Sequence, residues 1–234
     1  MVRYFGSLTL NKVQTNIFHS FHFSFDEVQP AFGEIQSVLK SENSDTGHWV
    51  DSIIQKIMPL LTNNGGITGG YILRRAEEVH LNTGSQIKGY MKGAKYLALF
   101  VCTAGTIFTD LFSCYNHEGN YLEAFIADTI GSLTVEKAMD KIQEKLALEM
   151  QVNGLQITNR YSPGYCNWAL SGQMELFEQI GDLPINISLT ESCLMLPIKS
   201  VSGIIGVGAN IRKRPYSCQI CKNKNCIYRK LIQE

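Results

Sequence analysis

The clearest hydrophobic pattern lies near the middle of the chain, where residues 96–103 form a nearly continuous apolar run. Such a run is typical of a strand that is buried on both faces of a sheet. It ends at Thr103-Ala104-Gly105, small residues that suit a corner between a strand and a helix. Apolar residues then recur at helical spacing from Thr106 onward. We therefore expect a central strand followed by a helix.

A long helical pattern covers residues 121–150, as one helix or as two that abut. Its apolar positions fall three and four residues apart and define one core-facing side. Gly131 lies in the middle and costs a helix about 1 kcal/mol relative to alanine, so the helix can bend there. Asp128 and Glu136 stand eight residues apart, a little over two turns, and therefore share a face. They are either two solvated surface acids or two acids that face a ligand.

The first 94 residues give weaker patterns. Residues 13–25 are rich in aromatic side chains that alternate imperfectly with polar ones, so we expect one strand there. Apolar residues at three- and four-residue steps predict amphipathic helices over 32–39 and 49–61. A short strand near 70–73 and a small helix at 85–91 follow.

Beyond residue 166 the pattern predicts one more helix and further strands. Ser171 is a suitable N-cap for this helix, and Gly181 is a suitable end. Apolar segments at 184–189, 194–197 and 201–207 predict strands. Because local strand pairs outnumber strand-helix-strand units, we expect an α+β fold with a mixed, largely antiparallel twisted sheet and flanking helices.

The length of 234 residues and an apolar content of 44% suit a single domain with an ordinary core. We divide the chain into residues 1–94, an N-terminal α/β part of the same domain; residues 95–210, its core; and residues 211–234, a basic, Cys-rich C-terminal tail. The 21 basic residues balance the 21 acidic ones, so the total charge indicates neither nucleic acid nor a membrane surface as a partner. The last 23 residues, however, hold seven basic residues and one acid, a net charge of +6.

The cysteine count indicates a reducing environment. There are seven cysteines, an odd number, and the sequence shows neither a secretory signal pattern nor an apolar run of membrane-spanning length. We therefore expect a cytoplasmic protein in which thiols serve as core residues or metal ligands.

The segment Asn159-Arg160-Tyr161-Ser162-Pro163-Gly164-Tyr165-Cys166 is the strongest candidate for ligand chemistry, and we expect it to form a structured loop. Arg160 offers a planar, permanently charged fork that suits a carboxylate. Pro163 fixes the backbone before Gly164, which lets a ligand lie against the main chain. Tyr165 adds an aromatic face that suits a cation. The segment thus fits a small ligand with a carboxylate and a positive centre, or else is a solvated surface turn.

The tail contains a second candidate site. Cys218-x-x-Cys221-x-x-x-x-Cys226 places three thiols within nine residues, among lysines and arginines that lower thiol pKa values. Cys166 and Cys193 are the candidates for a fourth ligand. An iron–sulfur cluster and a zinc ion both fit this spacing, and free thiols are the alternative.

Several of these pieces together resemble a known family. Phe100-Val101-Cys102-Thr103-Ala104-Gly105, the helix from Ala127-Asp128 to Glu136, Arg160-x-x-x-Gly164-Tyr165, Leu189-Thr190-Glu191-Ser192 and Ser200-Val201-Ser202-Gly203 occur in that order. Residues 95–208 are thereby similar to the activation (reactivation) domain of cobalamin-dependent methionine synthase, in its shorter free-standing form. Residues 1–94 fit the longer form of that domain poorly.

The resemblance implies a binding site for S-adenosylmethionine. It places Arg160, Gly164, Tyr165 and the adjoining Cys166 at the family's ligand loop, and Asp128 and Glu136 on the helix that flanks the ligand. Glu136 is the better match to the acidic contact there. The carboxylate, ammonium and sulfonium of this ligand suit a guanidinium, a carboxylate and an aromatic face.

The resemblance also implies partners. The methyl group would pass to a cobalamin carried by a methionine synthase or another corrinoid protein, with electrons from a flavodoxin-type donor. The tail cysteines leave an alternative function, an iron–sulfur reductive activator or electron carrier for a corrinoid protein that binds no methyl donor. A zinc-stabilised scaffold without chemistry is a third.

Overall fold

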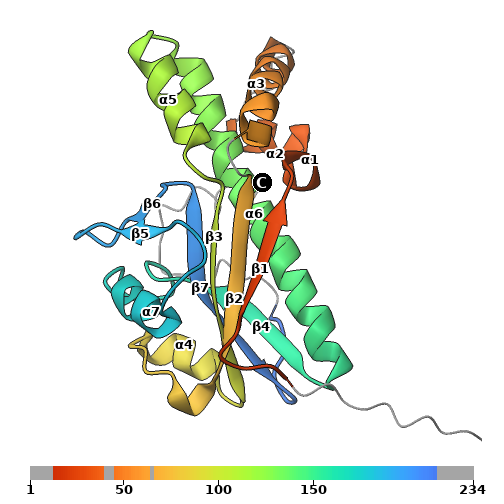
Figure 1. Ribbon diagram of the computed structural model, residues 1–234, viewed down its shortest axis with the longest axis vertical. Coiled ribbons are helices and arrows are strands. Elements are labelled where there is room, and N and C mark those ends of the chain that lie inside the picture. Colours follow the sequence, from red (N-terminus) through yellow and green to blue (C-terminus); the bar gives the residue numbers. More distant parts are fainter. Residues whose placement is uncertain (1–12, 40–44, 64–65, 215–234) are drawn as a thin grey trace, which may run out of the picture.

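A computed structural model describes residues 13–39, 45–63 and 66–214 of the chain. Its centre is a five-stranded sheet in the order β1-β2-β3-β7-β4, and every neighbouring pair is antiparallel. Figure 1 shows the strands side by side, crossed by one long helix. The strands are β1 (Phe18–Phe23), β2 (Ile67–Arg75), β3 (Tyr96–Thr103), β4 (Gln156–Tyr161) and β7 (Ser200–Gly208). Two short strands, β5 (Ser188–Leu189) and β6 (Met195–Leu196), pair separately.

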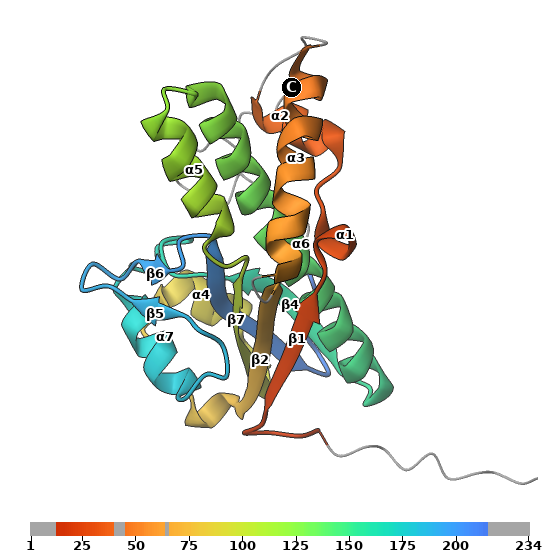
Figure 2. The same cartoon turned by 45° about the horizontal axis from the view of Figure 1, so that its top comes forward.

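Helices cover both faces of the sheet. The long helix α6 crosses one face diagonally, with α5 and α3 against its first half and α1 and α2 beside its middle (Figures 1 and 2). Helices α4 and α7 lie against the opposite face. Their bounds are α1 (Phe25–Val28), α2 (Phe32–Leu39), α3 (Asp45–Asn63), η1 (Ala76–Glu78, a single 3-10 turn), α4 (Gly84–Tyr90), α5 (Ile107–His117), α6 (Tyr121–Val152) and α7 (Gly172–Ile180). No helix in these ranges is long and apolar enough to cross a membrane.

Strand β3 is apolar throughout because both of its faces are buried. Successive side chains of a strand point to opposite faces, so alternate residues enter different cores. Ala98, Phe100 and Cys102 join the core beneath α6. Leu97, Leu99 and Val101 join the second core, beneath α4 and α7. The prediction of a central strand buried on both sides is confirmed, as is the α+β fold.

Most predicted elements occur close to their expected bounds, and one prediction is wrong. Residues 159–161 were expected in a loop, but they form the second half of β4, an edge strand. Only Ile157 and Thr158 of this strand are buried, and the pairing with β7 shifts register between Ile157 and Arg160. The strand expected at 184–189 is reduced to β5, and the long helical pattern is one continuous helix, α6.

Candidate functional site

The site is built on one stripe of α6 that faces the β4–β7 side of the sheet. Asp128, Ser132, Glu136 and Asp140 follow one another at four-residue steps, so they lie one turn apart on the same side of the helix. Their side chains meet two cations contributed by the sheet side of the molecule. Asp128 and Glu136 therefore share a face, as predicted, and neither is simply a solvated surface acid.

Arg160 on β4 is the first of these cations. Its Nη2 lies 2.5 Å from Oε2 of Glu136, and its Nη1 lies 2.6 Å from Oδ1 of Asp140. The guanidinium thus donates from both ends of its fork to two carboxylates on successive turns of α6. The side chain of Arg160 is 20% exposed, so water still reaches this group.

Glu136 lies in a less polar position than Asp140. Its side chain is half-buried between the helix and the sheet, whereas that of Asp140 is exposed. Desolvation raises the pKa of Glu136 above its ordinary value, and the nearby charge of Asp140 adds to the rise, while the Arg160 guanidinium opposes it. The Arg160–Glu136 pair therefore joins a permanent cation to a carboxylate that is costly to ionise at this place.

Lys199, between β6 and β7, is the second cation, and sequence reasoning did not identify it. Its Nζ lies 2.6 Å from Oδ1 of Asp128 and donates to Oγ of Ser132 at 2.9 Å. The lysine side chain is 9% exposed and that of Asp128 is 42% exposed. The available signal was a single lysine between two apolar segments, where a charged side chain needs a partner.

The predicted corner after β3 holds the backbone of this lysine. The amide of Ala104 donates to the carbonyl oxygen of Lys199 at 2.8 Å, and the hydroxyl of Ser200 donates to Oγ1 of Thr103 at 2.8 Å. Gly105 has φ +74°, a conformation that glycine adopts without strain. The end of β3 and the start of β7 are thereby fixed beside the first turns of α6.

The segment after β4 forms a tight loop that begins against β7. At Gly203 an added Cβ would lie 2.2 Å from the carbonyl oxygen of Tyr161, so only glycine permits this approach. Gly164 has φ +89° and its amide donates to the carbonyl oxygen of Trp168 at 2.8 Å. Cys166 also has a positive φ, 51°, and its half-buried side chain packs against the second core. Tyr165 is 63% exposed at the loop surface.

The predicted residues thus fall into two groups. Glu136 and Arg160 are in contact, and Asp128 lies two turns away on the same helix with Lys199 as its partner. Gly164, Tyr165 and Cys166 lie in the loop that continues from the strand of Arg160. Cys218, Cys221 and Cys226 lie outside the described residues. Within the described part of the chain, no group of three or more metal-binding side chains is present, and Cys102, Cys114, Cys166 and Cys193 form no disulfide.

Comparison with known proteins agrees with the resemblance seen in the sequence. The family model of the vitamin B12 dependent methionine synthase activation domain matches residues 86–228. Among solved structures, the chain is similar to a crystal structure of the MetH reactivation domain bound to AdoHcy, with 13% sequence identity and a TM-score of 0.58. That alignment covers 87% of this chain and 81% of the other. No curated protein matches the sequence.

Sequence and fold therefore lead to the same assignment. The family match spans more than half of the chain, and the sheet and its helices reproduce the fold of the solved domain. The chain belongs to the family of vitamin B12 dependent methionine synthase activation domains.

Proposed function

We propose that this protein binds S-adenosylmethionine and supports the reductive methylation of a cobalamin carried by a partner, either a methionine synthase or another corrinoid protein. The contact between Arg160 and Glu136 carries the proposal. A zwitterionic amino acid can replace such an ion pair with two new ones, its carboxylate facing the guanidinium and its ammonium facing the glutamate. The AdoHcy bound to the solved domain of the same fold contains such an amino-acid group.

The reaction asks for positioning rather than for acid–base chemistry from this chain. The reduced cobalt of the partner's cobalamin supplies the electron pair that takes the methyl group, and S-adenosylhomocysteine leaves. We infer that Arg160 and Glu136 hold the amino-acid end of the donor, while the bare backbone at Gly164 and the ring of Tyr165 lie alongside the rest. No side chain needs to accept a proton in this scheme. Electrons reach the cobalt from a separate donor, which we propose to be flavodoxin-like.

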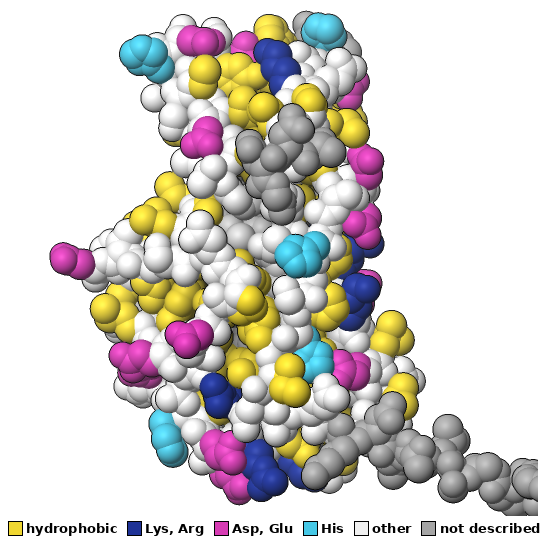
Figure 3. All heavy atoms as spheres, in the orientation of Figure 1, with side chains coloured by type: hydrophobic (Ala, Val, Ile, Leu, Met, Phe, Trp, Pro, Cys, Tyr) yellow, Lys and Arg dark blue, Asp and Glu magenta, His cyan; other side chains and the backbone are white. Residues whose placement is uncertain are grey.

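Exposed apolar side chains next to the loop suit contact with a partner. Leu194, Leu196 and Ile198 are each about half exposed on the β5–β6 segment. Figure 3 shows hydrophobic side chains gathered over this part of the molecule. Exposed apolar surface of this kind is common where another protein binds, and we propose that the corrinoid protein approaches here.

Calorimetric titration tests the ligand proposal. S-adenosylmethionine and S-adenosylhomocysteine should both bind the wild-type protein, and Arg160→Ala should weaken both by about 30-fold or more, because a charged hydrogen-bond partner is lost. Arg75→Ala is the control: it removes an exposed arginine at the C-terminal end of β2, a strand that β3 and β7 separate from β4. It should leave both affinities unchanged. Methylthioadenosine, which lacks the amino-acid group, should bind weakly and with equal affinity to wild type and Arg160→Ala. Equal loss of all three ligands in Arg160→Ala would contradict the assigned contact.

The role of Tyr165 has its own test. If its ring contacts the sulfonium, Tyr165→Leu should weaken S-adenosylmethionine several-fold and leave S-adenosylhomocysteine, whose sulfur is neutral, nearly unaffected, since a cation–π contact requires the charge. The same loss for both ligands would mean that the ring serves only as apolar surface.

The spacing of Cys218, Cys221 and Cys226 supports the second candidate function, an iron–sulfur reductive activator. Iron, sulfide and zinc analysis of anaerobically purified protein tests it, together with Cys221→Ser. A protein with stoichiometric iron that binds no S-adenosylmethionine would favour this alternative over the first proposal. A protein without iron would exclude it.

A further inference from the structure

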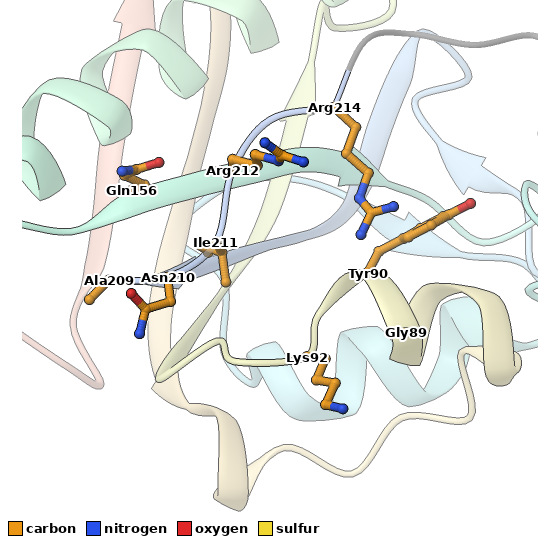
Figure 4. A pocket seen from close by; sticks show the side chains of 9 residues that line it. All are labelled: Gly89, Tyr90, Lys92, Gln156, Ala209, Asn210, Ile211, Arg212 and Arg214. Carbon is orange, nitrogen blue, oxygen red and sulfur yellow. The ribbon is translucent and has the colours of Figure 1, made fainter.

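A hollow of about 460 Å³ lies on the side of β4 opposite the Arg160 site. Within β4, the side chain of Arg160 meets α6, whereas the ring of the next residue, Tyr161, stacks on Tyr90 of α4. The hollow opens between the end of α4 and the segment that follows β7 (Figure 4). Its lining consists of Gly89, Tyr90, Lys92, Gln156, Ala209, Asn210, Ile211, Arg212 and Arg214.

Backbone contacts fix the shape of this hollow. After β7 the chain turns back toward β4, where Oδ1 of Asn159 accepts from the amide of Arg214 at 2.8 Å and Nδ2 of Asn159 donates to its carbonyl oxygen at 3.0 Å. Gly208 packs so closely that an added Cβ would lie 2.6 Å from the carbonyl oxygen of Gly93. The buried side chain of Ile211 anchors the segment between these two points. The walls are therefore preformed rather than created by a ligand.

The charge of the lining is entirely positive. Lys92, Arg212 and Arg214 contribute three cations, and no aspartate or glutamate lines the hollow. None of the three forms an ion pair with a carboxylate in the described part of the chain. The guanidinium carbon of Arg214 lies 4.8 Å from the centre of the Tyr90 ring, which orients the planar group while leaving its charge unneutralised.

The two arginines and the two amides occupy different parts of the hollow, and Lys92 lies apart from both arginines with its ammonium pointing away from them (Figure 4). Arg214 and Tyr90 lie together, Arg212 lies between them and the far end, and Gln156 and Asn210 lie at that end (Figure 4). Two guanidinium forks suit the tetrahedral, multiply charged oxygens of a phosphoryl group better than a single carboxylate. The volume is that of pockets for drug-sized ligands, so an organic group fits beside the phosphate.

We propose that this hollow binds a phosphate-bearing small molecule, with the phosphoryl oxygens at Arg212 and Arg214. The site is distinct from the one that contains Arg160 and Glu136, and neither depends on the other for its residues. The shared chemistry is the phosphoryl group. The ligand is either an inorganic phosphate bound at the arginines alone or a phosphate ester of nucleotide size whose organic part lies toward Gln156 and Asn210.

Calorimetric titration of the whole chain in metal-free buffer tests the proposal, with inorganic pyrophosphate and ADP as probes. Both should bind saturably at low ionic strength and more weakly as salt is added. Arg212→Ala and Arg214→Ala, two exposed positions, should each weaken both probes about tenfold or more. Arg212→Lys should fall between wild type and Arg212→Ala, because lysine keeps the charge but not the fork. Tighter binding of ADP than of pyrophosphate identifies an ester as the ligand, and equal binding identifies the free anion.

Lys88→Ala is the matched control. Lys88 is an exposed lysine of α4 that does not line the hollow, so its removal changes the net charge by the same amount. It should weaken the probes less than twofold. Absence of saturable binding would overturn the proposal, and so would an effect of Lys88→Ala as large as that of Arg212→Ala, because binding would then reflect diffuse charge.

Discussion

At the residue scale, the Arg160 contacts combine two opposing effects. The guanidinium favours the ionised form of Glu136, while removal of water from the half-buried carboxyl and the charge of Asp140 disfavour it. Desolvation is the largest of the three, and the pKa of Glu136 rises as a result. A carboxylate that is incompletely satisfied by its arginine is a suitable partner for an incoming ammonium, which would favour its ionised form.

The raised pKa of Glu136 predicts a pH-dependent stability. The folded protein holds this proton more tightly than the unfolded chain, so the group adds stability at low pH that is lost as pH rises through the raised pKa. Glu136→Gln cannot ionise, so its free energy of unfolding relative to wild type should increase between about pH 4 and neutrality. We expect a change below about 1 kcal/mol, because solvent screens a half-exposed group. Urea unfolding at several pH values measures it.

Glu144→Gln serves as the control for this experiment, since Glu144 is an exposed acid two turns further along α6. The difference in free energy of unfolding between Glu144→Gln and wild type should change less over the same pH range. If the free energy of unfolding of Glu136→Gln relative to wild type decreases as pH rises, then the effect of the arginine on the pKa of Glu136 outweighs that of desolvation.

The pair of Lys199 and Asp128 predicts an asymmetry between two variants. Asp128→Ala leaves a buried ammonium with Ser132 as its remaining side-chain partner shown here, which should cost about 2–4 kcal/mol. Lys199→Met leaves a carboxylate that water reaches and fills the buried position with an apolar chain, so the cost should stay below about 1 kcal/mol. Chemical denaturation of both variants measures the difference. Equal costs would show that the lysine is better solvated than its burial indicates.

At the element scale, the helices and strands with the most buried residues were the ones that the sequence predicted best. The pattern of β3 and of α6 is fixed by side chains that enter a core, so their bounds follow from apolar periodicity. Strand β4 has no such signal, because it is an edge strand with a register shift and only Ile157 and Thr158 buried. Its pairing depends on β7, which is distant in sequence, and its Asn159 side chain bonds to the backbone of Arg214, beyond the end of β7. Neither contact has a local sequence signature.

Packing between α5 and α6 gives Gly131 a different role from the one expected. An added Cβ would lie 2.6 Å from Cβ and Cγ of Phe108, so the glycine allows the two helices to approach closely. Gly131→Ala gains about 1 kcal/mol of helix propensity but forces Phe108 to move, and overpacking of this kind costs about 1–3 kcal/mol. We expect a net loss of about 1–2 kcal/mol in the free energy of unfolding.

Gly33→Ala in α2 is the matched control, because nothing lies within 4 Å of its added Cβ. That variant should be neutral or stabilised by a few tenths of a kcal/mol. Thermal and urea unfolding of both variants measure the two effects. Stabilisation by Gly131→Ala would show that α5 shifts at little cost.

At the scale of the whole molecule, the sequence predicted Arg160 and Glu136 as candidate site residues but did not predict that they contact each other. Arg160 was singled out by its own chemistry and Glu136 by the family resemblance, whereas Lys199 is placed by the corner after β3 and its contacts depend on a helix about 70 residues earlier. The basic character of the chain's end was also visible. Its return to β4 was not, because that depends on the backbone of Arg214 meeting the Asn159 side chain.

The sheet makes residues 1–94 and residues 95–210 mutually dependent. Strand β2 pairs with β3 from Thr68 to Arg75, and Phe23, Ile67 and Tyr71 lie in the same core as Phe100 and Ile142. A chain that begins at residue 95 would expose one edge of β3 and lack the core side chains that residues 1–94 contribute. We predict that residues 95–234 alone are insoluble or lack fixed tertiary packing, and that coexpression with residues 1–94 restores a folded complex. Near-UV circular dichroism and cooperative urea unfolding distinguish these outcomes. Cooperative unfolding of residues 95–234 by themselves would show that the second part is a domain in its own right, because its side of the sheet would then suffice to close a core.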